Sequence, residues 1–304
     1  MPDDPSPVPT SRPDRTPRPL NPPRAPLAMI GGAVTRALRF PDDLHDPDVE
    51  VVATDLVYDT PSGVSAPFKH LRLKHTPEVG GGTVDVLYLR YLGVNSGATR
   101  TADTEAAFRV FEAAGVQRIV VDDNMGSLNP LLDPGDLVVC HDFMDFHKEA
   151  SVAPLEGKLV RMREAYCPSL RRAIVETARR STTNRVFRRG VYAVSHGTRF
   201  ESPSEIQMYR QLGGDIVGYS LVPAIYLARA MGACYAGLYL VSNYGEGLIE
   251  QWEHDSVWQL SDDIAPTMGQ ILLDVLKRAP LPPDCGCASY TTRRPAGVVD
   301  YPDR

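Results

Sequence analysis

The last third of the chain alternates short apolar runs with amphipathic segments, and this alternation limits the fold more than any other sequence feature. The apolar runs 190–195, 215–219 and 234–242 have the length of strands, and the segments 203–212 and 222–231 between them read as helices. Strands that alternate with helices predict an α/β fold with a central sheet. Because successive βαβ units bring the loops after their strands to one edge of the sheet, we expect a ligand site at that edge.

Earlier segments extend the same pattern. A short apolar run leads into Gly31 and Gly32, a turn whose backbone amides can approach an anion. Gly115 directly follows a helical pattern and suits the position after a helix end. We therefore expect one domain over residues 29–279, with strands at 27–30, within 49–90, at 116–122 and at 136–140, a loop at 123–127, and helices at 101–114, 168–180 and 262–277.

Charge and hydropathy exclude two classes of partner. The chain has 32 Lys and Arg against 38 Asp and Glu, a formal net charge of −6. Nucleic-acid binders need clustered basic residues to neutralise phosphates, so we expect no nucleic-acid partner. No uninterrupted apolar run approaches the roughly 20 residues that a membrane-spanning helix needs, so we expect no membrane span.

The two ends of the chain differ in composition from the rest. Ten of the 27 prolines lie in residues 1–28, among Arg, Asp and Ser, which predicts a disordered, extended arm. This arm lacks the apolar segment of a secretory signal, and its prolines exclude the amphipathic helix of a mitochondrial transit peptide. We therefore expect a cytoplasmic protein, and we expect residues 280–304 to form a flexible tail with prolines and cysteines.

The five cysteines are an odd number, which does not suggest a disulfide framework. Cys140, Cys167 and Cys234 lie in apolar contexts, where we expect reduced, buried thiols. Cys285 and Cys287 lie in the tail, and a metal site there would need two more ligands, which the sequence does not place nearby. The sequence therefore predicts no metal.

Polar and aromatic side chains follow three of the predicted strands, in the loops 196–201, 218–220 and 242–246. Phe200 with Glu201 and Asn243 offers a ring that can stack, a carboxylate that accepts, and an amide that donates and accepts. These groups suit a heteroaromatic base. The alternative is that Phe200 packs in the core while Glu201 or Asn243 caps a helix.

The motifs GTRFESPSE at 197–205 and GGDIVGYSLVPA at 213–224, followed by an apolar strand that ends in Ser242-Asn243, resemble the signature region of a known family. This is the trimeric purine nucleoside phosphorylase and methylthioadenosine phosphorylase family. Weaker collinear matches at 30–32, 115–128, 134–138 and 166–168 extend the resemblance over about residues 27–279. The resemblance implies a nucleoside phosphorylase-like fold, with a central mixed sheet or barrel flanked by helices, and a homotrimer with active sites at subunit boundaries.

The resemblance also implies an activity, which is cleavage of the N-glycosidic bond of a purine nucleoside by a pentosyltransferase of purine salvage. It implies no cofactor and phosphate as the candidate co-substrate. Residue by residue, Phe200 matches the ring near the base, Glu201 the carboxylate that holds the purine edge, and Asn243 the residue that faces N7 and the 6-substituent. Tyr219 and Ser220 match the ribose and anion side of the site.

The identity of the base has two readings. Asn at position 243 resembles the branch that selects 6-oxopurines, because an amide can donate to an N7 and O6 pair. The sequences Gly-Ser-Leu at 126–128 and Tyr-Cys-Pro at 166–168 resemble the methylthioadenosine branch instead. Both a 6-oxopurine and a methylthio-type nucleoside therefore remain as candidate substrates.

The family's phosphate site is where this sequence departs from the pattern. Its glycine turn reads Gly31-Gly32-Ala33-Val34 and lacks the expected hydroxyl, and Tyr91 and Leu92 stand where Arg and His are expected. Asp122 and Asp123 stand where the family has small residues or Thr, so that an anion there would be repelled. Only Ser220 keeps an expected hydroxyl for phosphate.

These departures leave several alternatives. Water activated by Asp123 or Asp122 as general base would make the enzyme a nucleosidase, with Asn243, Glu201 and Asp123 as the catalytic residues. Phe200, Tyr219, Ser220, Gly32 and Asn124 are then the expected substrate-binding residues. Alternatively the two aspartates cap a turn and face solvent. Two further hypotheses remain. The protein could be a family member that binds a nucleoside without cleaving it, or an enzyme of specialised metabolism that acts on an unusual nucleoside.

Overall fold

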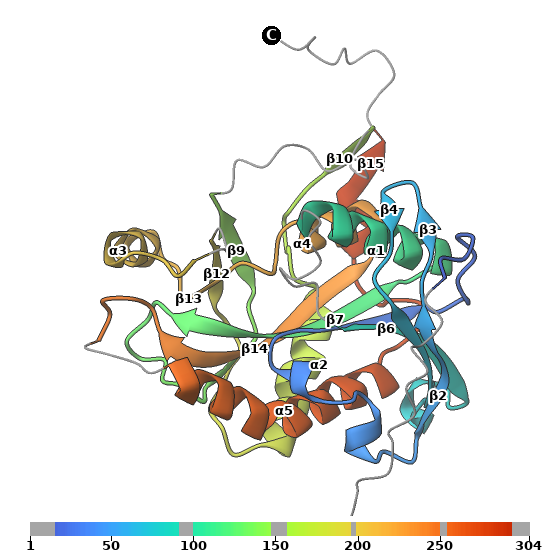
Figure 1. Cartoon of the computed structure of the whole chain (residues 1–304), viewed down its shortest axis with the longest axis horizontal. Helices are drawn as coiled ribbons and strands as arrows, with labels where there is room; N and C mark the ends of the chain where they lie inside the picture. The colour runs from blue at the N-terminus through green and yellow to red at the C-terminus, as the bar shows by residue number, and fades with distance from the viewer. Residues whose placement is uncertain (1–15, 91–99, 147–156, 196–198, 250–253, 294–304) are drawn as a thin grey trace, which may run out of the picture.

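The predicted strands and helices are present, and the computed structural model describes residues 16–90, 100–146, 157–195, 199–249 and 254–293 (Figure 1). The strands are β1 (Leu27–Gly31), β2 (Val49–Leu56), β3 (Asp59–Thr60), β4 (Gly63–Val64), β5 (Phe68–Lys74), β6 (Thr83–Arg90), β7 (Arg118–Ser127), β8 (Leu137–Val138), β9 (Asp142–Asp145), β10 (Lys158–Val160), β11 (Val186–Phe187), β12 (Val191–Val194), β13 (Ile216–Gly218), β14 (Cys234–Tyr244) and β15 (Thr291–Arg293).

The α-helices are α1 (Arg100–Ala114), α2 (Pro168–Ser181), α3 (Pro203–Gln211), α4 (Ala224–Ala230) and α5 (His254–Lys277), and the short 3₁₀ turns are η1 (Thr35–Ala37), η2 (Asp42–Leu44), η3 (Pro77–Val79) and η5 (Cys287–Tyr290). The helix α5 begins eight residues before the predicted 262. It has an internal proline, Pro266, that did not end the helix.

The described residues form an 11-stranded mixed sheet in the order β11-β8-β14-β7-β1-β6-β5-β2, which β13, β12 and β9 continue from β7. At its centre β1 is parallel to both β6 and β7, and β14 is parallel to β7. The centre is buried on both sides, since every residue of β1 and almost every residue of β14 is buried. Continuous apolar runs such as these are what a sheet covered on both faces requires.

Helices cover the two faces of the sheet and create two cores (Figure 1). On one face, α1 and α4 pack through Phe108, Phe111 and Leu227. On the other face, α2 and α5 pack through residues such as Ile174 and Leu272. The prediction of an α/β fold with a central mixed sheet flanked by helices is confirmed.

The two predicted βαβ units differ from each other. β12 and β13 are parallel neighbours joined through α3, as predicted. The second unit is not a parallel pair, because β13 runs antiparallel to β7 while β14 runs parallel to it. The cause is the length of β7, which continues to Ser127 and pairs with both strands. The predicted loop at 123–127 is therefore wrong, and these residues are part of a strand.

The predicted disordered arm at 1–28 is wrong in the part that the structure describes. The backbone N–H of Arg18 donates to the carbonyl of Val57 at 2.9 Å, and the N–H of Ala25 donates to the carbonyl of Ala114 at 3.0 Å. Proline-rich chain can be held in this way because its remaining N–H and C=O groups pair with neighbouring strand and helix ends. Residues 1–15 lie outside the described residues.

The predicted flexible tail at 280–304 is also wrong up to Arg293. β15 pairs antiparallel with β10, and Cys287 is buried. The carboxylate of Asp284 accepts a hydrogen bond of 2.8 Å from Arg118, a buried residue of the central strand β7. This segment therefore packs on the domain as an additional part of it. Residues 294–304 lie outside the described residues.

Across the described ranges, none of the helices combines the length and the apolar character that crossing a bilayer requires.

Candidate active site

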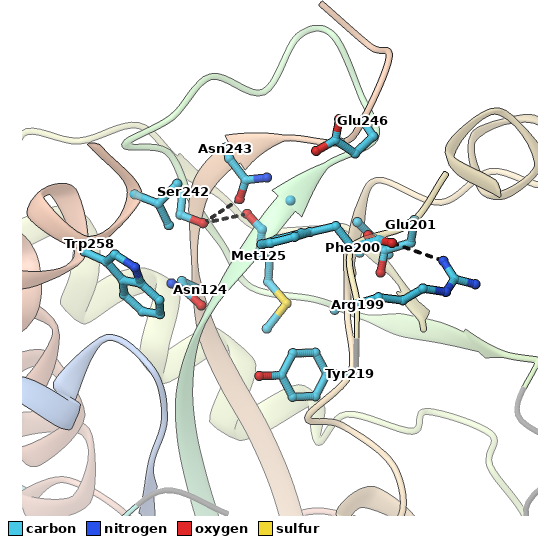
Figure 2. Close-up of a pocket in the computed structure, with 15 residues that line it drawn as sticks. Asn124, Met125, Arg199, Phe200, Glu201, Tyr219, Ser242, Asn243, Glu246 and Trp258 are labelled. Carbon is cyan, nitrogen blue, oxygen red and sulfur yellow. Dashed lines mark hydrogen bonds between the residues drawn. The ribbon is translucent and has the colours of Figure 1, made fainter. Parts of the chain in front are cut away.

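A cavity of about 280 Å³ opens where the carboxyl ends of β7, β13 and β14 meet the loop before α3 (Figure 2). Of the predicted site residues, five line it: Asn124, Phe200, Glu201, Tyr219 and Asn243. The expectation that loops after successive strands converge on one edge is confirmed. The remaining lining residues are Met125, Gly126, Arg199, Val217, Gly218, Ser242, Gly245, Glu246, Val257 and Trp258.

Asn243 is a buried amide held in one orientation. The hydroxyl of Ser242 donates to its Oδ1 at 2.9 Å, and its own Nδ2 donates to the carbonyl of Tyr244 at 3.0 Å. The register of β14 shifts between Val241 and Asn243, which turns the amide toward the cavity. A side chain at Gly126 would begin 3.5 Å from Nδ2, so the glycine keeps the space before the amide open. A fixed amide of this kind can donate to a ring nitrogen or a carbonyl oxygen.

The loop before α3 presents Phe200 and Glu201. Glu205 and Ser202 form a capping box at the start of α3, and Arg199 makes two hydrogen bonds of 2.8 Å to the Glu205 carboxylate. Hydrogen bonds from Arg199 and from the backbone N–H of Ser202 lower the pKa of Glu205 to about 2. Glu205 is therefore engaged in holding the loop, and Glu201 is the carboxylate of this loop that lines the cavity, which Glu246 lines from beyond the end of β14.

Phe200 lies across the mouth of the cavity and is 53% exposed (Figure 2). The alternative that it belongs to the core is therefore wrong. The capping alternative for Glu201 is wrong as well, because Ser202 is the N-cap residue of α3. Residues 196–198 of the same loop lie outside the described residues.

Trp258 is a lining residue that the sequence did not assign. It lies on α5, and the guanidinium of Arg36 stacks over its ring at 3.9 Å from the centroid. On the same side, the Nδ2 of Asn124 donates to the hydroxyl of Ser261 on α5 at 3.3 Å. Trp252 and Trp258 lie between the predicted loop at 242–246 and the predicted helix at 262–277, and the sequence left open whether they shape the pocket or pack elsewhere. Trp252 lies outside the described residues.

The glycine turn after β1 is filled by carboxylates of the chain itself. One oxygen of Asp122 accepts from the N–H of Gly32 at 3.0 Å and from the Thr35 hydroxyl at 2.7 Å, and the other accepts from the N–H of Thr35 at 3.0 Å. Asp123 accepts from the N–H of Ala33 at 3.0 Å. Four donors that could bind an anion are thus bonded to two buried side chains.

These contacts correct two expectations. The alternative that Asp122 and Asp123 face solvent is wrong, since they are 2% and 6% exposed. The glycine turn does have a hydroxyl, because Thr35, the residue directly after the motif 31–34, supplies one. Gly32 is needed for close approach, since a Cβ there would collide with the backbone carbonyl of Asp122. The guanidinium of Arg90 donates to the backbone carbonyl of Arg36. Tyr91 and Leu92, which stand where the family has Arg and His, lie outside the described residues.

Gly32, Asp123 and Ser220, the other predicted residues, line a second and much smaller space of about 20 Å³. This is room for about one water molecule. The hydroxyl of Ser220 lies 3.3 Å from that of Tyr192. The predicted site residues therefore fall into two groups, five around the larger cavity and three around the filled turn.

The sequence and the fold place this chain among known proteins. A sequence model described as the Phosphorylase superfamily matches residues 48–277. The chain belongs to this superfamily.

Two relatives in the phosphorylase superfamily are particularly similar. The chain is 35% identical over 179 residues to a probable 6-oxopurine nucleoside phosphorylase of Moorella thermoacetica, covering 57% of this chain and 68% of the relative. It is 34% identical over 184 residues to the 6-oxopurine nucleoside phosphorylase of Pyrococcus furiosus, covering 57% and 69%. Among solved structures, a methylthioadenosine phosphorylase from an antarctic soil metagenomic library superposes with a TM-score of 0.70 at 21% identity, covering 88% of this chain and 91% of that one.

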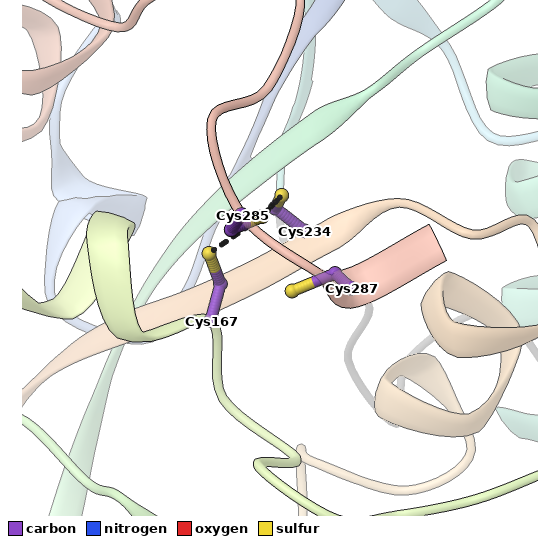
Figure 3. A group of neighbouring side chains, drawn as sticks. All are labelled: Cys167, Cys234, Cys285 and Cys287. Atoms are coloured by element: carbon purple, nitrogen blue, oxygen red, sulfur yellow. Dashed lines mark hydrogen bonds between the residues drawn. The ribbon is translucent and has the colours of Figure 1, made fainter. Parts of the chain in front are cut away.

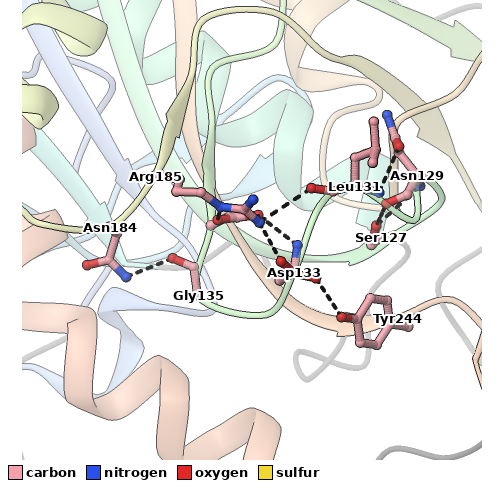
Figure 4. Close-up of polar contacts among 9 residues, drawn as sticks. Ser127, Asn129, Leu131, Asp133, Gly135, Asn184, Arg185 and Tyr244 are labelled. Atoms are coloured by element: carbon pink, nitrogen blue, oxygen red, sulfur yellow. Dashed lines mark hydrogen bonds and ion pairs between the residues drawn. The ribbon is translucent and has the colours of Figure 1, made fainter.

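A network of charged side chains supports Asn243 in this phosphorylase fold (Figure 4). The guanidinium of Arg185 bonds to Asp133 and to the buried Asp136. Asp133 in turn accepts from the hydroxyl of Tyr244 at 2.8 Å. Because the carbonyl of Tyr244 is the acceptor for the Asn243 amide, the network fixes the residue that orients Asn243.

The buried Asp122 predicts a pH-dependent stability. Burial raises its pKa from 3.8 to about 6, against opposing hydrogen bonds from Thr35 and Gly32. The folded state therefore binds the proton more tightly than the unfolded state, so this contribution is complete below about pH 4 and is lost as the pH rises through about 6. A pKa shift of this size corresponds to about 3 kcal/mol of folding free energy.

We expect the free energy of unfolding of the wild type to fall relative to that of Asp122→Asn by up to about 3 kcal/mol between about pH 4 and pH 7. Urea unfolding of both proteins across this range measures the difference. A difference that stays constant with pH would show that Asp122 does not titrate there.

Proposed function

We propose that this protein cleaves the N-glycosidic bond of purine nucleosides. The observation that carries the proposal is the buried, oriented amide of Asn243 in a cavity that also presents Glu201 and Phe200. Asn243 would donate to the purine ring, Glu201 would accept from its N–H groups, and Phe200 would cover its face. An amide donor favours a 6-oxopurine, and the names of the two relatives agree with this choice.

The chemistry proposed for these residues is stabilisation of the departing base. As the bond to the sugar breaks, electrons move onto the purine, and a donor that is already in place stabilises that charge without reorganising. Asn243 is fixed by Ser242 and Tyr244 before any substrate binds. Tyr219 and Trp258 would line the space for the sugar. No cofactor is needed for such a reaction, only an acceptor for the sugar.

The family favours phosphate as the acceptor, which makes the protein a phosphorylase and a pentosyltransferase. A second candidate, hydrolysis, is favoured by one specific observation. The amides of Gly32, Ala33 and Thr35 are bonded to Asp122 and Asp123, in a space with room for about one water. Water needs a general base, and Asp123 or Asp122 would be that base.

Base release from inosine, guanosine, adenosine and methylthioadenosine, measured by chromatography with and without phosphate, separates the candidates. Release that requires phosphate identifies a phosphorylase, and release in phosphate-free buffer identifies a nucleosidase. If no base is released from any of the four while a base analogue still binds, the protein is a binding member or acts on an unusual nucleoside, and the proposed activity is wrong.

We also propose that the protein is a cytoplasmic homotrimer. The resemblance to trimeric phosphorylases motivates the trimer, and the exposed ring of Phe200 at the cavity mouth is consistent with cover from a neighbouring subunit. None of the five cysteines forms a disulfide, which agrees with a reducing compartment. Light scattering would measure the mass of the assembly, and a monomer would contradict the trimer.

A further inference from the structure

Four of the five cysteines meet at one point in the fold (Figure 3). The Sγ atoms of Cys167, Cys234, Cys285 and Cys287 all lie within 4.8 Å of one another. The expectation that Cys285 and Cys287 have no further ligands nearby is therefore wrong. The two additional thiols come from parts of the chain that are distant in sequence.

Each cysteine occupies a defined position in a packed element. Cys167 is the N-cap residue of α2, and Cys234 is the first residue of β14. Cys287 begins η5, with Cys285 two residues before it. Cys167, Cys234 and Cys287 are buried, and Cys285 is partly exposed. The sulfur atoms are thus held by a rigid helix end, a strand end and a packed turn.

The distances between the sulfur atoms fit coordination. A zinc ion with Zn–S bonds of about 2.3 Å at the centre of a tetrahedron sets its sulfur atoms about 3.8 Å apart. The Sγ of Cys285 lies 3.6 Å from that of Cys167 and 3.2 Å from that of Cys234. We propose that these four cysteines bind one Zn²⁺ ion in a closed structural site.

The charges around the cluster support this proposal. Zn²⁺ with four thiolates carries a net charge of −2, and two buried arginines adjoin the site, of which Arg118 also pairs with Asp284. Arg118 bonds to the hydroxyl of Ser169 at 3.0 Å, and this hydroxyl lies 3.5 Å from the Sγ of Cys167. Arg229 bonds to the carbonyl of Cys287 at 3.2 Å.

Arg229 is only 2% exposed and bonds to carbonyl oxygens but, among the described residues, to no carboxylate. A buried cation without an anionic partner is costly. A zinc–thiolate group next to Cys287 would supply the missing negative charge.

The site is distant from the cavity and would act on stability. Cys234 begins β14 and Asn243 lies near its other end, a separation of about 30 Å along a strand. The ion would join the segment around Cys285 to the ends of α2 and β14. Four protein ligands leave no open coordination position, which is typical of structural zinc. The four thiols lose their protons on binding.

The test is the metal content of the full chain, purified without chelators or added metal and measured by mass spectrometry of the elements. We expect one zinc per chain. Exchange with Co²⁺ should give the intense visible bands of a tetrahedral thiolate site. We expect Cys285→Ser to lose zinc to a chelator at least about tenfold more readily than the wild type. Replacing a residue that only contacts a ligand already lowers metal affinity about 10- to 100-fold, and replacing the ligand itself should lower it at least as much.

Cys140→Ala is the matched control, because Cys140 is the fifth cysteine and is buried outside the cluster. It should keep its zinc. Three results would overturn the proposal. A wild-type mass lower by two hydrogens for each cystine would show disulfides, five titratable thiols without metal would show an unliganded cluster, and iron in place of zinc would show a different centre.

Discussion

Asn243→Ala will lower kcat for base release about 100- to 1,000-fold and leave the fold intact. Removing one preorganised donor from a site where charge develops costs about 3–4 kcal/mol of transition-state stabilisation. Asn243 meets the conditions for such a donor, because it is buried and both ends of its amide are held by neighbours. Steady-state rates with inosine, together with thermal unfolding, measure both parts of the prediction.

Asn243→Asp is the informative companion variant. Following the resemblance, a protonated carboxyl at this position suits 6-aminopurines, so the ratio of kcat/KM for inosine to that for adenosine should fall. Glu201→Ala should also lose most activity, whereas Glu176→Ala, an exposed glutamate on α2, should not. Turnover of Asn243→Ala or Glu201→Ala at the wild-type rate would mean that the base does not bind in this cavity.

Replacing both Asp122 and Asp123 by alanine will make the stability of the protein depend on phosphate. The two changes remove the acceptors from the N–H groups of Gly32, Ala33 and Thr35. Each buried donor left unpaired costs about 1–3 kcal/mol, so the melting temperature should fall clearly. Phosphate can then bind in the turn. At a concentration of about 100 times its dissociation constant, it would raise the free energy of unfolding by about 2.7 kcal/mol.

Thermal unfolding of wild type and double variant, with phosphate or with chloride at equal ionic strength, measures this effect. The phosphate-specific rise in melting temperature should be larger for the double variant than for the wild type, because the wild type's own carboxylates fill the turn. An equal phosphate-specific shift in both proteins would show that phosphate binds elsewhere. Thr35→Val, which removes only the hydroxyl donor to Asp122, should have a smaller effect and no phosphate rescue.

The elements predicted correctly are those with local signals. Ser202, Pro203 and Glu205 mark the start of α3 at the residue where the structure begins it. β7 was predicted too short because Asp122, Asp123 and Asn124 are polar, and polarity usually ends a strand. The two aspartates remain in the strand because their partners are backbone groups about 90 residues earlier in the chain, and the Asn124 amide bonds to Ser261 on α5. A local pattern contains no information about such partners.

The same distinction applies to the sites. Phe200, Glu201 and Asn243 were found because each lies near the carboxyl end of a predicted strand, in motifs that resemble those of a known family. The cysteine cluster was missed because Cys167 and Cys285 are 118 residues apart. Trp258 was left unassigned because the predicted helix began at 262, whereas α5 begins at His254. Contacts between distant segments depend on the completed fold.

The pairing of Arg118 with Asp284 has a consequence for how the chain is made. Arg118 lies at the start of β7, almost fully buried, and its carboxylate partner is synthesised 166 residues later. The guanidinium therefore has its charged partner only once the segment 280–293 is present and packed against the domain. A chain shortened before residue 280 would leave this guanidinium buried without its carboxylate, so we expect such a truncation to destabilise the whole domain rather than to remove a dispensable tail.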